Sequence, residues 1–325
     1  MISAVISKHL RVFLFGLALA CAELGWAVPA PVTEPPPAAL GRLEKLRVRE
    51  MGVDRAGNLW AWGSGLGMVT LISPAGIDLG VMKASGAQTV DVDSEWGVIG
   101  LFLDGYEIQW LKDDGEPRVT IRLGGPAADV CWLGPDLVAV TPQKAGHRIE
   151  IWDVKKKALV KTLGEETPLH PVPGATRMRA VLLRYDFARG LLYSLESFTG
   201  DLQVFDREGR LAWKSSVENP RRPEFEKWLQ EVDATAKAQR DVQTPIIFGL
   251  RLALSSEGNL WVLQRRDEEK HTETFLQIGP KNQSPHILAE GTCPSDSFVL
   301  WTSRFVTFRD SSSPRGPCVG WIPVR

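Results

Sequence analysis

Val53-Asp54-Arg55-Ala56-Gly57-Asn58-Leu59-Trp60 returns late in the chain as Leu254-Ser255-Ser256-Glu257-Gly258-Asn259-Leu260-Trp261. In each copy a glycine can take the positive φ that a tight turn needs, and Asn-Leu-Trp then opens a strand. A turn and strand that recur with the same residues indicate a structural repeat.

Weaker copies of this stretch lie between the two clear ones and after them. They are Val92–Ile99, Leu133–Val138, Tyr185–Leu192 and Cys293–Trp301. The early copies are about 40 residues apart, which is the spacing of four short strands in one propeller blade. The period therefore predicts an all-β repeat fold.

A second short apolar strand follows each of the first five turns. These strands are Met68–Leu71, Ile108–Trp110, Ile149–Trp152, Leu202–Phe205 and Phe275–Ile278. Short strands rich in Val, Ile, Leu and Trp, bounded by Gly, Pro or Asp, are typical of propellers. We expect a six-bladed β-propeller over residues 42–325, with seven blades as the alternative.

The Asp-x-x-Gly-Asn-Leu-Trp segment at 54–60 resembles NHL-repeat propellers and the related ligand-binding propellers of bacterial sensor proteins. The resemblance implies the architecture and, in this motif, a structural role: Asp and Gly shape the turn, and Trp packs between blades. It brings no catalytic residue with it.

The first 20 residues have the composition of an export signal. Lys8, His9 and Arg11 precede an apolar run at 12–20 that ends in Ala18-Leu19-Ala20. A basic start, a short apolar core and a small-residue cleavage site are typical of a signal peptide, and nine apolar residues are too few to span a bilayer. We expect the protein to be exported to the periplasm, the cell surface or the medium.

Cys21 follows the expected cleavage site directly. Leu19-Ala20-Cys21 resembles the lipobox of bacterial lipoproteins, although Ala18 stands where that motif prefers Leu. Cys21 is thus a candidate for lipidation, and a cysteine that merely falls in the signal peptide is the alternative. The proline-rich segment 21–41 is expected to be a semi-rigid linker.

The remaining cysteines would lie in an oxidising compartment after export. Cys293 and Cys318 both fall in the last repeat and are candidates for a disulfide. Cys131 lies in an apolar strand and is expected to be a buried small hydrophobic residue.

A helix is predicted inside an insertion at 217–243. Phe225, Trp228, Leu229 and Val232 recur at helical spacing, and Pro223 suits a first helical turn. The helix is either a lid packed on the rim of the propeller or a partner-binding helix that uses these four apolar side chains.

The innermost strands of the blades supply the candidate ligand-binding residues. Glu50, Asp91, Arg184 and Arg251 alternate with apolar positions there, so they are expected to face the central channel. Two arginines and two acids could hold a small anionic or zwitterionic ligand. Alternatively, these charges pair with one another and fix the blades.

An enzyme is the less favoured interpretation. Glu50 and Asp91 could bind a divalent cation such as calcium in a lactonase- or esterase-like hydrolase, by resemblance to the gluconolactonase-like propellers, which use Glu, Asn and Asp as ligands. However, no asparagine stands at a matching inner-strand position, and the chain has no G-x-S-x-G motif. We therefore expect no catalytic residue and no required cofactor.

The charge balance narrows the partner class. Lys and Arg number 38 against 39 Asp and Glu, a net charge of −1 that argues against nucleic acid as a partner. The sequence predicts an exported, non-catalytic module that binds an envelope protein, a peptide or a small ligand. Contact with a membrane is expected only through the signal or a lipid anchor.

Overall fold

The computed structural model describes only part of the chain. The described residues are 38, 40, 43, 48–63, 66–143, 146–164, 181–235, 250–254, 260–267, 272–278, 286–291, 297–301, 304–309 and 318–323. The predicted signal peptide and Cys21 lie outside them, as does nearly all of the predicted linker. Two units divide the chain, Met1–Pro36 and Pro37–Arg325, and every described residue belongs to the second.

The described strands form antiparallel sheets, each built from consecutive strands. The first two sheets are β1 (Val48–Val53), β2 (Leu59–Gly63), β3 (Met68–Ile72) and β4 (Asp78–Lys83), then β5 (Thr89–Asp93), β6 (Gly97–Phe102), β7 (Glu107–Leu111) and β8 (Pro117–Arg122). The third is β9 (Ala127–Trp132), β10 (Leu137–Pro142), β11 (Ile149–Asp153) and β12 (Ala158–Leu163). Each of these sheets has the up-and-down order of a propeller blade.

The later sheets repeat the pattern with one exception. The fourth is β13 (Val181–Asp186), β14 (Leu191–Glu196), β15 (Asp201–Phe205) and β16 (Leu211–Ser216), and the fifth is β17 (Arg251–Leu254), β18 (Leu260–Asp267), β19 (Thr272–Ile278) and β20 (His286–Gly291). A last sheet has three described strands, β21 (Ser297–Trp301), β22 (Arg304–Arg309) and β23 (Cys318–Pro323).

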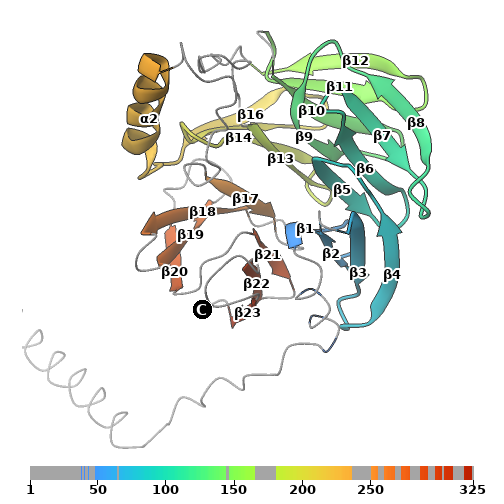
Figure 1. Ribbon diagram of the computed structural model, residues 1–325, viewed down its shortest axis with the longest axis horizontal. Helices are drawn as coiled ribbons and strands as arrows, with labels where there is room; N and C mark the ends of the chain where they lie inside the picture. Colours follow the sequence, from blue (N-terminus) through green and yellow to red (C-terminus); the bar gives the residue numbers. More distant parts are fainter. Residues whose placement is uncertain are drawn as a thin grey trace, which may run out of the picture. The chain divides into compact units, whose positions relative to one another are not determined.

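The first strands of the sheets lie side by side around a centre (Figure 1). β5 lies against β1 and β9, β13 lies against β9 and β17, and β21 lies against β17 and β1. The all-β propeller predicted from the sequence is therefore confirmed.

The predicted number of blades is wrong. The described residues show five four-stranded blades, not six or seven, and the last sheet is one strand short. The sequence pattern predicts that the sixth copy of the turn lies between the first two strands of a sixth blade. Instead, the strand that follows it, β21, is the innermost of its sheet, because it is the one that contacts β1 and β17.

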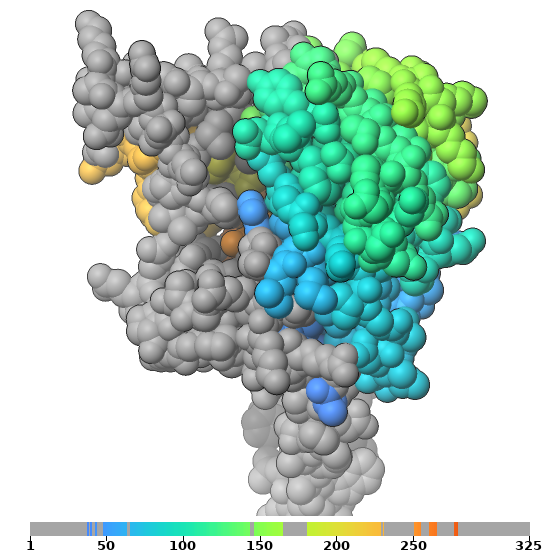
Figure 2. Space-filling view, turned by 45° about the vertical axis from the view of Figure 1, so that its right-hand side comes forward, coloured from blue at the N-terminus to red at the C-terminus, as the bar shows by residue number. Residues whose placement is uncertain are grey.

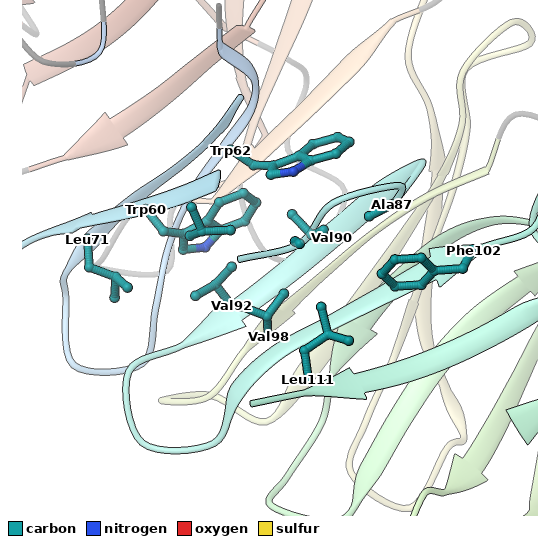
Figure 3. Packing of buried hydrophobic residues seen from close by; sticks show 11 residues of the cluster. Trp60, Trp62, Leu71, Ala87, Val90, Val92, Val98, Phe102 and Leu111 are labelled. Atoms are coloured by element: carbon teal, nitrogen blue, oxygen red, sulfur yellow. The ribbon is translucent and has the colours of Figure 1, made fainter. Parts of the chain in front are cut away.

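The core of the propeller lies between blades and not within them. Figure 3 shows Trp60 and Trp62 of β2 packed against Val90 and Val92 of β5, with Val98 and Leu111 behind them. Similar clusters join blades two and three, three and four, and four and five. On the side seen in Figure 2, the first three blades, blue to green, form one continuous surface.

One helix is present among the described residues, α2 (Arg222–Thr235), inside the predicted insertion. Phe225 is 2% exposed, and its ring stacks on Phe198 with centroids 4.1 Å apart. Phe198 follows β14, so the helix is held against the fourth blade. Among the described residues, no helix combines the length and apolarity needed to cross a bilayer.

Candidate functional site

The repeated turn is held by its aspartate. Asp54 Oδ1 accepts the N–H groups of Ala56 and Asn58 at 2.9 and 2.8 Å, and Asp54 Oδ2 accepts Asn58 Nδ2 at 2.9 Å. Oδ2 also accepts the N–H of Ser94 in the second blade at 3.1 Å. The motif that reveals the fold thus shapes its own turn and links it to the next blade.

Two other turns use an aspartate in the same way. Asp93 Oδ1 accepts the N–H groups of Glu95 and Trp96, and Asp186 Oδ1 accepts those of Ala188 and Arg189. We call the end of the blades that carries the turns 54–58, 93–97 and 186–190 the turn face.

The channel carboxylates join successive blades. Glu50 Oε2 on β1 accepts the Val90 N–H of β5 at 3.0 Å, and Asp91 Oδ2 on β5 accepts the Trp132 N–H of β9 at 2.8 Å. Asp129 Oδ2 on β9 accepts the Leu183 N–H of β13 at 2.8 Å. The innermost strands of the first three blades therefore each accept a backbone N–H of the next blade's innermost strand.

The two predicted arginines lie on the innermost strands of the fourth and fifth blades. Arg184 NH1 lies 3.5 Å from Asp129 Oδ2 and donates to the Leu183 carbonyl at 2.6 Å. Arg251 is half-buried at the start of β17. Glu50, Asp91 and Arg184 lie close enough for their charges to interact, and their ligand-binding role stays a prediction.

Sequence reasoning missed Asp129 and Thr89. Thr89 Oγ1 lies 3.0 Å from Glu50 Oε2 and 3.2 Å from Asp129 Oδ1. Thr89 stands four places before Asp93 and Asp129 four places before Leu133, just as Glu50 stands four places before Asp54. Matching the repeats position by position would have found them.

Burial changes the acidity of this group. It raises the pKa of Glu50 to about 7, with the nearby Asp129 carboxylate adding to the effect, and it raises the pKa of Asp91 to about 6. The pKa of Asp129 is raised by burial as well. Burial opposes the charge of Arg184, but the carboxylates of Asp129, Asp91 and Glu50 raise its pKa overall.

A small cavity lies where the channel reaches the turn face. Its volume is about 30 Å³, and Asp54, Asp91, Arg184, Tyr185 and Phe187 are among its lining residues. That volume holds roughly two water molecules, whereas pockets for small organic ligands usually measure about 300 Å³ or more. The cavity is too small to enclose a metabolite.

A chain of aromatic rings extends from this cavity, which Trp132, Tyr185 and Phe187 line. Trp110 contacts Trp132 edge to face at 5.6 Å, Trp132 contacts Trp96 at 5.8 Å, and Trp96 contacts Phe187 at 5.4 Å. Tyr185 completes the chain 4.8 Å from Phe187. All except Trp132 are half-buried, so their rings are partly open to solvent. We call these five residues the aromatic chain.

Charged side chains surround the aromatic chain. The Arg55 guanidinium lies 4.5 Å above the Trp96 ring and pairs with Asp93 and Glu95. Arg189 pairs with Asp186 at 3.1 Å. The turn face thus combines half-open aromatic rings with charges of both signs.

The described residues include no group of three or more His, Cys, Asp or Glu side chains arranged to hold a metal ion. Glu50 and Asp91, the predicted calcium ligands, are already hydrogen-bonded to backbone N–H groups. The hydrolase alternative stays a prediction.

The predicted partner-binding residues lie on α2. Phe225 is covered by Phe198, and Trp228, half-buried, stacks on Phe225 with centroids 5.9 Å apart. The backbones of Leu229 and Val232 belong to the helix, while their side chains lie outside the description. This arrangement supports the lid, and a partner-binding role of the four residues stays a prediction.

The cysteine predictions fall mostly outside the described residues. Cys293 is not described, and Cys318 is described only as the first backbone position of β23. Their disulfide stays a prediction. Cys131 is a free thiol and buried, and burial raises its pKa well above the ordinary value.

These features place the chain in the structural class of β-propellers. No protein-family model matches the sequence, and no curated protein matches it. The NHL-type resemblance is therefore limited to the turn and strand that suggested it.

The fold is similar to solved propellers at very low sequence identity. Hydrazine synthase from Kuenenia stuttgartiensis is 9% identical with a TM-score of 0.51, over 93% of this chain and all of that one. Virginiamycin B lyase from Staphylococcus aureus is 10% identical with a TM-score of 0.47, over 86% and 84%. The Cps50 (Swd1) β-propeller domain from Myceliophteria thermophila is 9% identical with a TM-score of 0.47, over 80% and 78%. This likeness shows the fold alone.

Proposed function

We propose that the protein is a non-catalytic binding scaffold whose protein or peptide partner docks on the turn face. The observation that carries this proposal is the aromatic chain, half-open to solvent beside the mouth of the channel. Partly open Trp, Tyr and Phe side chains provide most of the binding energy in many protein interfaces.

The chemistry of the channel supports docking over catalysis. Glu50, Asp91 and Asp129 are hydrogen-bonded to the backbone of neighbouring strands, so they act in holding the blades together. The cavity above them has room for an atom or two of a ligand but not for a substrate. A partner would therefore bind across the mouth and not within it.

The rim of the turn face suits a specific contact. Arg55, Glu95 and Arg189 are at least a third exposed, and each pairs within the rim. Exposed charges around an aromatic centre set the on-rate and the choice of partner more than they set the affinity.

The partner belongs in the compartment to which residues 1–20 direct the chain. Lys8, Arg11 and the apolar run at 12–20 support export, and Cys21 would allow lipid anchoring. We therefore propose an envelope protein or peptide as the partner.

A site-specific crosslinking experiment tests the docking face. A photoreactive amino acid replaces Glu95 on the turn face in one variant and Val160 on β12 in the other, since both positions are exposed. After irradiation in cells, we expect one discrete adduct from position 95 and none from position 160. An adduct from position 160 alone, or none from either variant, would overturn the proposal.

A substitution in the aromatic chain then measures its contribution. Phe187→Ala removes a half-buried ring from the centre of the chain, and we expect the adduct at position 95 to fall at least tenfold. Tyr106→Ala is the matched control, because Tyr106 is a 46% exposed aromatic residue outside the chain. Circular dichroism would establish that both variants are folded.

A further inference from the structure

One hydroxyl group lies between two carboxyl groups in the channel. Thr89 Oγ1 is within hydrogen-bonding distance of Glu50 Oε2 and of Asp129 Oδ1. A threonine hydroxyl carries a single hydrogen, so it can donate to only one of these oxygens. Both contacts are hydrogen bonds only if one of the two carboxyl groups carries a hydrogen of its own.

The other neighbours of these carboxyl groups fit this arrangement. Glu50 Oε2 accepts the Val90 N–H, and the Asp129 oxygens accept the Val130 and Leu183 N–H groups at 2.9 and 2.8 Å. These bonds hold the carboxyl oxygens in place, but none of these N–H groups donates a hydrogen to Thr89 Oγ1. A proton on Glu50 or Asp129 would supply the hydrogen for the second contact.

The charge balance of the channel points the same way. The ionisable side chains that the innermost strands contribute, apart from the turn residues, are Arg49 and Glu50 on β1, Asp91 on β5, Asp129 and Cys131 on β9, Arg184 and Tyr185 on β13, and Arg251 on β17. Arg49 is exposed and lies over Trp62, and the pKa values of Cys131 and Tyr185 are raised, which keeps both neutral. The sequence of β21 has no ionisable residue. Three carboxyl groups thus act on the single guanidinium of Arg184, so a proton on one of them reduces the excess of negative charge.

We propose that Glu50 and Asp129 share one proton through Thr89, and that losing this proton weakens the contact between the first three blades. Glu50 lies on blade one, Thr89 on blade two and Asp129 on blade three, so the three-residue bridge spans all of them. Without the proton, two carboxylates repel each other across one hydroxyl.

The raised pKa of Glu50 gives the sign of the effect. The folded protein holds a proton that the unfolded chain releases near pH 4.5, because the pKa of Glu50 is about 7 in the fold. The stability that this proton confers is fully present below pH 4.5 and is lost as the pH rises through 7. Asp91, with a pKa of about 6, has lost most of its own proton by pH 7.

The test is the stability of the purified protein against urea at pH 6.5, 7.5 and 8.5. For the native sequence we expect the folded-to-unfolded ratio to fall about fourfold over this range, most of it between pH 6.5 and 7.5. In Glu50→Gln the folded-to-unfolded ratio should change much less with pH, because the glutamine amide can donate to Thr89 without titrating. Thr89→Ser keeps the hydroxyl group, so its folded-to-unfolded ratio should change with pH as in the native protein. Glu208→Gln, at an exposed carboxylate, is the matched control and should follow the native protein.

A direct measurement needs no substitution. Carbon-13 NMR of protein labelled at the Asp and Glu carboxyl carbons should show one carboxyl of the pair titrating between pH 6 and 8. If Glu50→Gln fails to fold, Asp129→Asn serves in its place, since its amide can also donate to Thr89. Equal pH dependence in Glu50→Gln and the native protein, or titration of both carboxyls below pH 5, would overturn the proposal.

Discussion

At the scale of single residues, Arg148 is a fully enclosed charge. Its side chain is 0% exposed, its Nε donates to Ser194 Oγ at 2.7 Å, and NH2 donates to the carbonyls of Ser194 and Asp201. NH1 pairs with the Asp201 carboxylate. One side chain of the third blade thus satisfies four acceptors on the fourth.

Replacing this arginine should destabilise the fold strongly. We expect Arg148→Ala to lower the free energy of unfolding by about 3 kcal/mol, because it leaves buried acceptors without donors. Urea unfolding measures the change. Arg210→Ala is the control, since Arg210 is 74% exposed with its two ion pairs, and its loss should cost less than about 1 kcal/mol. If the free energy of unfolding fell equally in the two variants, Arg148 would contribute no more to stability than an exposed ion pair does.

Position 52 has no room for a side chain, so only glycine fits there. A Cβ added there would lie 2.5 Å from Trp60 Cζ2, because the indole ring lies across the β1 backbone. Gly52→Ala should therefore lower the free energy of unfolding by about 2 kcal/mol. Gly134→Ala is the matched variant, with no atom within 4 Å of the added carbon, and thermal unfolding should show almost no change for it.

At the scale of elements, the sequence predicted strands well where apolar residues and a glycine turn coincide. The third strands of the first five blades were all found, and β3 and β7 extend the predicted ranges by a residue or two. Hydrogen bonds from a single aspartate to its own turn make this signal local, so it survives in one sequence. In the sixth copy, Cys293–Ser295 contains no glycine, and the order of the strands there depends on the contacts of β21 with β1 and β17.

The channel was only partly predictable for a related reason. Glu50 and Asp91 stand out because charged residues interrupt apolar strands, whereas Asp129 lies beside a turn, Leu133–Asp136, that lacks the glycine spacing of the others. The aromatic chain joins residues of three blades, and no spacing along the sequence encodes such a contact.

The helix α2 is held against the fourth blade by a stacked pair and by Asn219, which donates to the Ser197 and Phe198 carbonyls. Phe225→Ala removes the ring that stacks on Phe198, so we expect the helix to detach while the blades remain folded. Hydrogen exchange should speed up at least tenfold in α2 and remain unchanged in β5–β8. Gln230→Ala, on an exposed position of the same helix, should leave exchange as it is. Unchanged exchange in Phe225→Ala would mean that the stacked pair does not hold the helix.

At the scale of the whole propeller, the three-stranded sheet lies where the first and fifth blades meet. β21 lies against both β1 and β17, while β1 and β17 also approach each other directly. Two structural routes therefore connect the first blade with the fifth. If the contacts through β21 stabilise the ring more than the direct contact of β1 with β17, the three-stranded sheet closes the ring. If they do not, the sheet is dispensable for closure.

Deleting residues 297–325 separates these two cases. If β21 closes the ring, the truncated protein should melt at least about 10 °C lower, and hydrogen exchange should rise first in β1 and β17, because both lose a packed neighbour. Deleting residues 1–36, which belong to a separate unit, is the control and should leave the melting temperature nearly unchanged. An unchanged melting temperature in the first truncation would mean that direct contact of β1 with β17 suffices, and the five four-stranded blades would then form a stable ring by themselves.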